Sequence, residues 1–275
     1  MTAAVTRPTP TRVRPAHVDR LAARLSPRDW RVIETVNRLR VVSGWQLERL
    51  CFAELGSARS RTVTRSRVLG RLVRERVLVA VGRQIGGAGR GSTVQAYALD
   101  VAGRQLVVRR QLGEAERLRV RRPGAPGERT LRHTLAVSEL YAQLVEQAPA
   151  ADARVATFRA EPGAWWPNGL GGFIKPDAYV VLGRGDVRDH WWAEVDLATE
   201  SLPTIRAKIQ TYLSFRERGA RGPDEVLPWL VISTTTAKRR AAIAELVRRL
   251  PEAAELVTVV EGREAAETML EILRE

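Results

Sequence analysis

The chain contains few of the residues that build disulfides and metal-thiolate centres. It has one cysteine, Cys51, and three histidines, His17, His133 and His190, among 275 residues. One cysteine excludes an internal disulfide and a cysteine-based zinc site, and three scattered histidines exclude a histidine-based metal cage. Cys51 lies on the apolar face of a predicted helix, so we expect a buried and unreactive thiol. The sequence is therefore not that of a secreted domain stabilised by disulfides.

Long apolar segments are also missing. No stretch of about 18 apolar residues could span a membrane as a helix. The first residues, MTAAVTRPTPTRVRP, lack the apolar middle of a secretory signal peptide. Apolar residues still make up 44% of the chain, which is enough for a packed core. These features predict a cytoplasmic, globular protein that does not enter a membrane.

Positive charge is abundant, and it is unevenly distributed along the chain. The formal net charge is +14. Residues 1–132 contain 28 arginines and 10 acidic residues, whereas residues 133–275 contain 17 basic and 21 acidic residues. A GC-rich genome would explain arginine in place of lysine, but it would not explain the asymmetry. The first half is therefore predicted to bind a polyanion, with double-stranded DNA preferred over a membrane surface or an acidic protein.

The first half has the element order of a winged helix-turn-helix. Helical periodicity predicts a helix to about residue 40 after Ser26, a second after Ser43, and a third over 62–76. Two strands follow, at 77–81 and 93–99, with a glycine-rich tip between them. No Gly-Lys-Ser/Thr follows these glycines, which argues against a phosphate-binding P-loop.

In a winged helix the third helix enters the major groove and the wing lies along the backbone. Arginines of the third helix and of the hairpin are therefore the expected DNA contacts. These are Arg61, Arg65, Arg67, Arg71, Arg74, Arg83 and Arg90.

The second half predicts an α/β domain in which three strands follow one another. Its expected elements are a helix at 131–147, strands at 154–159, 174–182 and 189–197, a helix at 201–216, a strand at 226–233, a helix at 238–249, a strand at 256–260 and a helix at 263–274. We therefore expect an α+β or α/β chain with four parts. These are a flexible basic arm (1–19), a winged helix domain (20–102), a linker (103–130) with a short helix near 104–119, and the α/β domain (131–275).

Three acidic residues of this domain are expected to meet on one face of the sheet. Asp177 opens the second strand. Glu194 and Asp196 lie two residues apart on the third strand, so both side chains point to the same face of the sheet. Clustered carboxylates repel each other unless a cation neutralises them, and their hard oxygens suit Mg²⁺ or Mn²⁺. We expect Asp177 and Glu194 to bind this ion, which would activate water for attack on a phosphodiester. Glu139, on the preceding helix, is a fourth acidic candidate.

A structural interpretation of the same acids stands beside the catalytic one. Acids at strand ends are often solvated, and Lys208 could simply pair with Glu194 or Asp196. His133 lies two turns before Glu139 on the predicted helix. We expect it to be a capping or surface residue rather than a catalytic one.

Pro176-Asp177 and Glu194-Val195-Asp196, in this order of helices and strands, resemble the PD-(D/E)XK nuclease superfamily. The resemblance implies a restriction-endonuclease-like fold, metal binding by Asp177 and Glu194, and a lysine that orients the nucleophile. Asp196 occupies the position at which that superfamily has its lysine. Lys208, on the next helix, and Lys175, two residues before Asp177, are the candidate replacements.

Three stretches carry a second resemblance. They are Ile174-Lys-Pro-Asp-Ala-Tyr-Val-Val-Leu182, Trp192-Ala-Glu-Val-Asp-Leu-Ala-Thr-Glu-Ser201 and Ile205-Arg-Ala-Lys-Ile-Gln-Thr-Tyr-Leu213. With the pattern Glu-x-Asp-x-x-Thr-Glu, they are similar to the replication-relaxation family of plasmids and integrative elements, over roughly residues 25–240. The resemblance implies a role in plasmid replication or DNA relaxation during mobilisation, with other replication or transfer proteins as partners.

Two functions are compatible with these patterns. The first is metal-dependent cleavage or nicking of the DNA of a mobile element. The alternative is a non-enzymatic accessory factor or regulator, whose inactive nuclease-like domain serves for dimerisation or partner docking. Asp196 in place of lysine favours the alternative, and the remaining acids with Lys208 favour the enzyme. A covalent tyrosine nucleophile, as in nicking relaxases, is a third mechanism, and Tyr212 is its first candidate because it lies one turn after Lys208.

The tryptophan pairs at 165–166 and 191–192 bear on assembly. Neighbouring residues of a strand face opposite sides of the sheet, so one of Trp191 and Trp192 points away from the core. Packing beneath a covering helix is the first interpretation, and a homodimer contact is the second.

Overall fold

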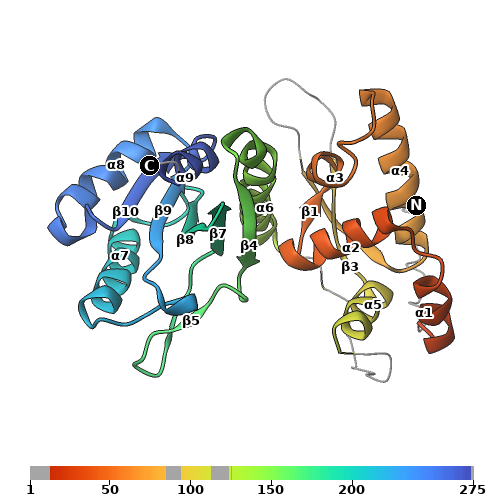
Figure 1. The fold of residues 1–275 in the computed structure, drawn as a ribbon, viewed down its shortest axis with the longest axis horizontal. Helices are drawn as coiled ribbons and strands as arrows, with labels where there is room; N and C mark the ends of the chain where they lie inside the picture. The colour runs from red at the N-terminus through yellow and green to blue at the C-terminus, as the bar shows by residue number, and fades with distance from the viewer. Residues whose placement is uncertain (1–12, 85–93, 113–123, 125, 274–275) are drawn as a thin grey trace, which may run out of the picture.

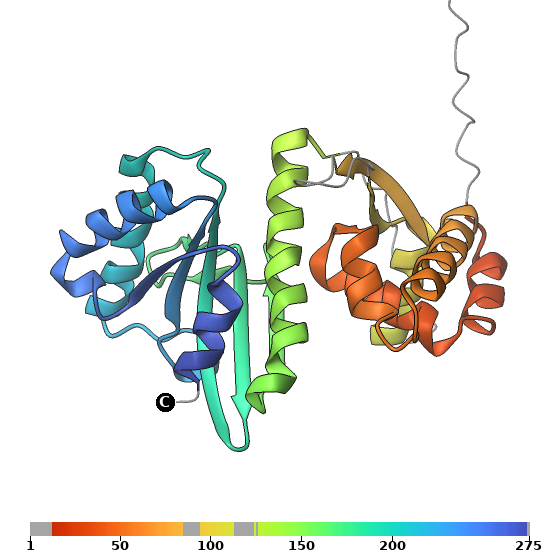
Figure 2. The same cartoon turned by 90° about the horizontal axis from the view of Figure 1, so that it is seen from above.

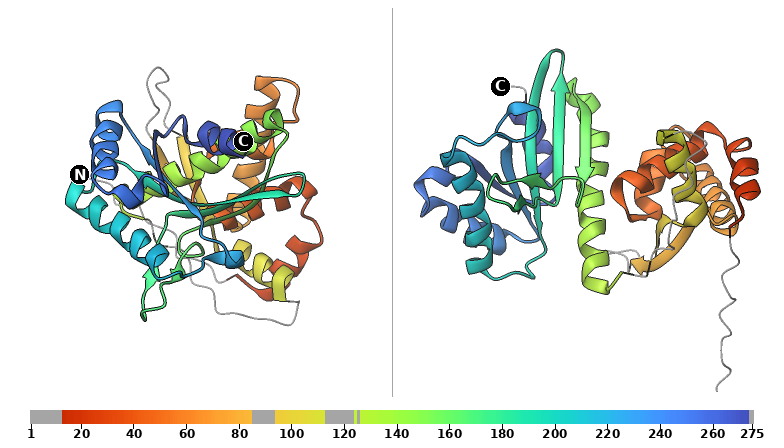
Figure 3. Two further views of the ribbon diagram at one scale, coloured as in Figure 1. Left: turned by 60° about the vertical axis from the view of Figure 1, so that its left-hand side comes forward. Right: turned by 90° about the horizontal axis from the view of Figure 1, so that it is seen from below.

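The computed structural model describes residues 13–84, 94–112, 124 and 126–273 (Figure 1). Helices and strands form two groups that lie side by side. The long helix α6 (Glu128–Gln147) stands between the groups, as the views of Figures 2 and 3 show. The chain is thus a mixed α and β protein, as the sequence predicts.

The N-terminal group is a helical unit with a small antiparallel sheet. Its elements are α1 (Pro15–Ala22), α2 (Pro27–Leu39), β1 (Val42–Ser43), α3 (Gly44–Cys51), α4 (Ala58–Arg74), β2 (Leu78–Gln84), β3 (Val94–Leu99) and α5 (Val101–Leu112). The sheet has the order β1-β3-β2. Ser26 and Ser43 form capping boxes at the starts of α2 and α3, which fixes where these helices begin. The helices and strands predicted within residues 26–99 are confirmed.

Two segments differ from the sequence prediction. Helix α1 occupies part of the predicted flexible arm, because Pro15 suits the first turn and Val18 and Leu21 are buried. Helix α5 begins inside the predicted winged helix domain and runs into the predicted linker. It packs on α1 and α2, so this part of the predicted linker belongs to the N-terminal group.

The C-terminal group is built on one five-stranded mixed sheet of order β10-β9-β8-β7-β4. Its elements after α6 are β4 (Arg154–Ala160), β5 (Trp166–Pro167), β6 (Phe173–Ile174), β7 (Ala178–Arg184), β8 (Val187–Asp196), α7 (Leu202–Glu217), β9 (Trp229–Thr234), α8 (Ala237–Arg248), β10 (Val257–Glu261) and α9 (Ala265–Ile272). Strands β4, β7 and β8 pair antiparallel, and β8, β9 and β10 pair parallel. The sequence did not predict the short hairpin β5–β6, and Ile174, the first residue of the strand predicted at 174–182, belongs to β6 instead of β7.

The two faces of this sheet are covered by different helices. Trp191 packs on the side of α6 and α9, whereas Trp192 packs on the side of α7 and α8. Figure 2 shows α6 and α7 on opposite sides of the sheet. Both tryptophans are fully buried, so each lies beneath covering helices, as the first interpretation expected. The alternation of β8 therefore turns Glu194 toward α7.

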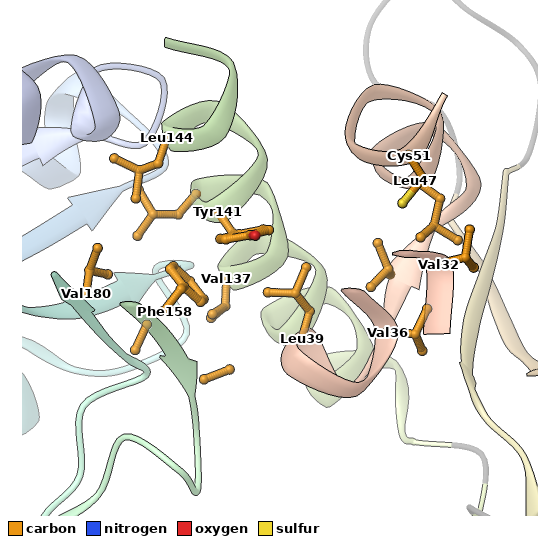
Figure 4. Packing of buried hydrophobic residues seen from close by; sticks show 14 of the residues in the cluster. Val32, Val36, Leu39, Leu47, Cys51, Val137, Tyr141, Leu144, Phe158 and Val180 are labelled. Atoms are coloured by element: carbon orange, nitrogen blue, oxygen red, sulfur yellow. The ribbon is translucent and has the colours of Figure 1, made fainter. Parts of the chain in front are cut away.

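Helix α6 joins the two groups into one core. On one side Tyr141 and Leu144 pack toward Phe158 of the sheet, and on the other the buried cluster continues through Leu39 (Figure 4). Polar contacts cross the same boundary. Gln46 Nε2 donates to the Leu135 carbonyl at 2.9 Å, and Ser138 Oγ donates to the Val41 carbonyl at 2.7 Å.

Cys51 offers a test of this packing. Its side chain is fully buried, and burial raises the pKa of the thiol to about 11, because the thiolate is the disfavoured form. We expect native protein to react with a thiol reagent near pH 8 far more slowly than denatured protein, as measured by release of the coloured leaving group. Rapid labelling of the native chain would contradict the buried position.

Candidate active site

Asp177 and Glu194 lie next to each other on neighbouring strands. The β7–β8 register pairs Ala178 with Ala193, which places Asp177 across from Glu194. The Asp177 backbone N–H donates to the Ala193 carbonyl at 3.0 Å, and the Val195 N–H donates to Asp177 Oδ2 at 2.7 Å. Both acids are buried and both line one cavity of about 380 Å³. Other side chains around it include His133, Trp165, Lys175, Asp196, Glu200, Lys208 and Tyr212.

Glu194 is held by two side chains of α7. Lys208 Nζ lies 3.1 Å from Glu194 Oε2, and the Tyr212 hydroxyl donates to Glu194 Oε1 at 2.7 Å. Burial and the neighbouring Asp177 raise the pKa of Glu194, and these effects outweigh the opposite influence of Lys208 and Tyr212. The carboxyl group therefore gains from any further positive charge brought into the cavity.

Lys208 lies between two carboxylates. Its Nζ is 3.1 Å from Glu194 and 3.0 Å from Glu200. Burial alone would lower the pKa of Lys208, but the two carboxylates outweigh it and raise the pKa. The other candidate lysine, Lys175, lines the same cavity and places its Nζ 4.8 Å from the centre of the Trp165 ring. Lys208 is thus the lysine that contacts the acid.

Asp196 has a partner of its own. Arg239, in the first turn of α8, binds it with two hydrogen bonds, Nε at 2.6 Å and Nη2 at 3.1 Å. Arg239 Nη2 also donates to the Glu200 carbonyl at 2.7 Å. This arrangement gives a physical reason for the Glu-x-Asp-x-x-Thr-Glu pattern. Asp196 fixes Arg239, Arg239 fixes the backbone at Glu200, and the Glu200 carboxylate reaches Lys208.

Helix α6 contributes a histidine to the cavity. His133 Nε2 lies 2.9 Å from Asp177 Oδ1, and this hydrogen bond raises the pKa of His133 despite burial. His133 is therefore not the capping or surface residue that the sequence predicted. The spacing of residues along the helix could have indicated this position. His133 is four residues before Val137, so it shares the helix face that covers the sheet. Glu139 points elsewhere and accepts hydrogen bonds from Arg49 at 2.6 Å and Gln46 at 3.0 Å.

Asp177 and Glu194 are the candidate metal ligands of the cavity. Within the described ranges, no group of three or more histidine, cysteine or acidic residues has the arrangement of a metal site. Mg²⁺, however, is commonly bound through one or two carboxylates, with water and substrate phosphates completing its shell. Asp177 and Glu194 are two neighbouring carboxylates in an accessible cavity, so their oxygens fit Mg²⁺ or Mn²⁺.

Several of the predicted DNA-binding arginines are engaged within the N-terminal group. Arg65 pairs with Glu48 at 2.7 Å, Arg71 pairs with the buried Asp29, and Arg61 donates to the Leu55 carbonyl at 3.0 Å. The first two contacts hold α4 against α3 and α2, and the third ties α4 to the segment that precedes it. They give the three arginines a structural role that periodicity alone did not indicate.

A different set of arginines is exposed on α4. Arg59, Arg67 and Arg74 are exposed and, with the exposed Val63, follow one face of the helix. Within the described residues, these three form no ion pair. Arg59 was missed because the predicted helix began at residue 62, whereas α4 begins at Ala58 after its cap at Ser57. Of the remaining predicted contacts, Arg90 and the side chain of Arg83 lie outside what the structure describes.

Comparison with known proteins adds one finding. The family model described as replication-relaxation matches residues 33–230. No curated protein and no solved structure matches the chain. In the described part of the chain, no helix is long and apolar enough to cross a membrane. The matched region contains α3, α4, the acids of the cavity and Lys208, and it covers well over half of the sequence. The chain belongs to the replication-relaxation family.

Proposed function

We propose that the protein acts on plasmid or other mobile-element DNA and nicks or cleaves it with the help of Mg²⁺ or Mn²⁺. Its family supports a role in replication or relaxation. The observation that carries the nuclease proposal is the pair Asp177 and Glu194 across adjacent strands, with Lys208 in contact with Glu194. Two acids that can bind a metal ion and an ammonium group that can stabilise negative charge, all beside one cavity, suit metal-assisted hydrolysis of a phosphodiester.

In this proposal the N-terminal group is a winged helix that binds double-stranded DNA. Three helices and an antiparallel sheet of order β1-β3-β2 support it. So do the exposed arginines of α4, the helix that would enter the major groove. The C-terminal group is then a nuclease-like domain, supported by the helix, three antiparallel strands, helix and parallel strand in that order.

The chemistry follows from the residues of the cavity. Asp177 and Glu194 would hold the metal ion, which when bound supplies a water of lowered pKa and a positive charge for the phosphate. Lys208 adds a fixed positive charge where negative charge grows on the phosphate oxygens during attack. Water loses a proton to solvent and forms the new bond to phosphorus, while the bond from phosphorus to the departing deoxyribose oxygen breaks and that oxygen takes up a proton from solvent. Hydrolysis therefore leaves both DNA ends free of protein.

Tyr212 is not proposed as a covalent nucleophile. It is buried, and its hydroxyl donates to Glu194. Burial and the nearby carboxylates raise its pKa well above the ordinary value, which disfavours the phenolate that would attack phosphorus. Tyr212 is instead a positioning residue for Glu194.

A second candidate function rests on a specific observation. Each of the three acids already has a basic partner: His133 for Asp177, Lys208 for Glu194 and Arg239 for Asp196. Such pairing neutralises the acids without a metal ion. It supports an accessory protein in which the nuclease-like domain has lost catalysis and serves for docking or dimerisation.

One assay separates the two functions. With Mg²⁺ or Mn²⁺ we expect the protein to convert supercoiled plasmid carrying its own element's DNA into open circles, and we expect EDTA to stop it. After denaturation, the products should carry no covalently bound protein. A protein that binds the plasmid but leaves it supercoiled with both metals would support the accessory function. A covalent DNA–protein adduct would instead support Tyr212 as the nucleophile.

A further inference from the structure

The hairpin formed by residues 165–175 projects from the C-terminal group near the label β5 in Figure 1. Strands β5 and β6 pair antiparallel, with Trp166 opposite Ile174 and Pro167 opposite Phe173. They form a two-stranded sheet separate from the five-stranded one. The hairpin directly precedes Asp177, so the chain returns from it into the proposed catalytic cavity.

Large apolar side chains are exposed on this hairpin. Leu170 is 69% exposed, Phe173 is 53% exposed and Trp165 is 37% exposed. Scattered exposed apolar residues are ordinary, but three within a short hairpin form a patch that points to a binding partner.

The hairpin is held in a fixed shape, so these side chains are presented in set positions. Asn168 Oδ1 accepts hydrogen bonds from the backbone of Leu170 at 2.8 Å and of Gly172 at 3.0 Å. At the base, Trp166 Nε1 donates to the Arg221 carbonyl at 2.9 Å. Gly169 and Gly171 have φ values of 75° and 79°, a conformation that favours glycine. A rigid apolar tip binds a partner with little loss of conformational entropy.

The base of the hairpin combines aromatic and cationic groups. Trp165 and Lys175 line the cavity that contains Asp177 and Glu194, and Lys175 lies over the Trp165 ring. Arg129 lines the same cavity. Aromatic faces that stack on bases, beside cations that bind phosphates, are the features of single-stranded nucleic acid sites.

We propose that this hairpin is a wedge that binds unpaired DNA bases beside the cavity, so that the substrate is locally melted rather than intact duplex. The inference rests on the proposed function. Base pairs of intact duplex are stacked, and apolar side chains reach them only by entering between base steps and unstacking them. Leu170 and Phe173 would make these contacts, while Lys175 meets the adjacent phosphate.

The test measures binding without cleavage. The full chain is titrated in EDTA with a duplex oligonucleotide and with the same duplex carrying a central unpaired bubble, each with 2-aminopurine in the centre. We expect the bubble to bind about tenfold more tightly, as one stacked base would give, with a change in 2-aminopurine fluorescence. Leu170→Ser combined with Phe173→Ser should remove the preference and the fluorescence change, and should leave duplex affinity unchanged.

Val187→Ser is the matched control, because Val187 is 54% exposed at the opposite end of β8 from Glu194. It should bind like the native chain. Equal binding of bubble and duplex by the native chain, or a preference retained by the double variant, overturns the wedge alone. A native dimer that the double variant converts to a monomer assigns the patch to a second copy and also overturns it. A native chain that binds neither oligonucleotide overturns the proposed function as well.

Discussion

Replacing Glu194 with glutamine is expected to lower the rate of metal-dependent nicking by about 10²–10³-fold or more, because one of two proposed metal ligands loses its charge. DNA affinity measured in EDTA should stay close to that of the native chain, since binding is proposed to reside in the N-terminal group. The variant should fold. The pKa of Glu194 is raised by burial, so the folded state already disfavours the charged form that glutamine removes.

Glu139→Gln is the matched control for this substitution. Glu139 is also acidic and was also a candidate, but it contacts Arg49 and Gln46 outside the cavity. It should nick plasmid at the native rate. Equal nicking by Glu194→Gln and the native chain would remove Glu194 from the mechanism. If Glu194→Gln loses both DNA affinity and nicking, the variant has a folding defect, which a thermal melt would detect.

Local sequence patterns predicted most of the helices and strands and the central pair of acids. Serine caps located α2 and α3, strand alternation put Glu194 and Asp196 on one face of the sheet, and helical periodicity turned Lys208 toward these acids. The proximity of Asp177 and Glu194 could be predicted because consecutive strands commonly pair as neighbours in one sheet.

Contacts between distant segments could not be predicted from the sequence patterns. Arg239 is 43 residues from Asp196, and no periodicity connects them. The pairs of Arg65 with Glu48 and Arg71 with Asp29 depend on how α4 packs against α3 and α2. The hairpin β5–β6 has strands of two residues each, which are too short for alternation to reveal.

The exposed arginines of α4 lead to a prediction about DNA binding. Changing Arg59, Arg67 and Arg74 together to alanine should weaken duplex binding strongly. Each lost phosphate contact should also make the slope of log K against log salt concentration less negative by about 0.9, because fewer counterions are released on binding. Titrations by fluorescence anisotropy at several salt concentrations measure both quantities. Since the three side chains are exposed and form no ion pair within the described residues, the melting temperature should change little.

Arg65→Ala provides the contrasting control. Its side chain is 15% exposed and pairs with Glu48, so its loss should lower the melting temperature and leave the salt slope of DNA binding unchanged. The opposite pattern, with an altered slope for Arg65→Ala and a native slope for the triple variant, would contradict this assignment. It would mean that α4 binds DNA through the face that here packs on α3, which requires the Arg65–Glu48 pair to open. The slope therefore reports which face of α4 meets the phosphates, and the melting temperature reports which face holds the N-terminal group together.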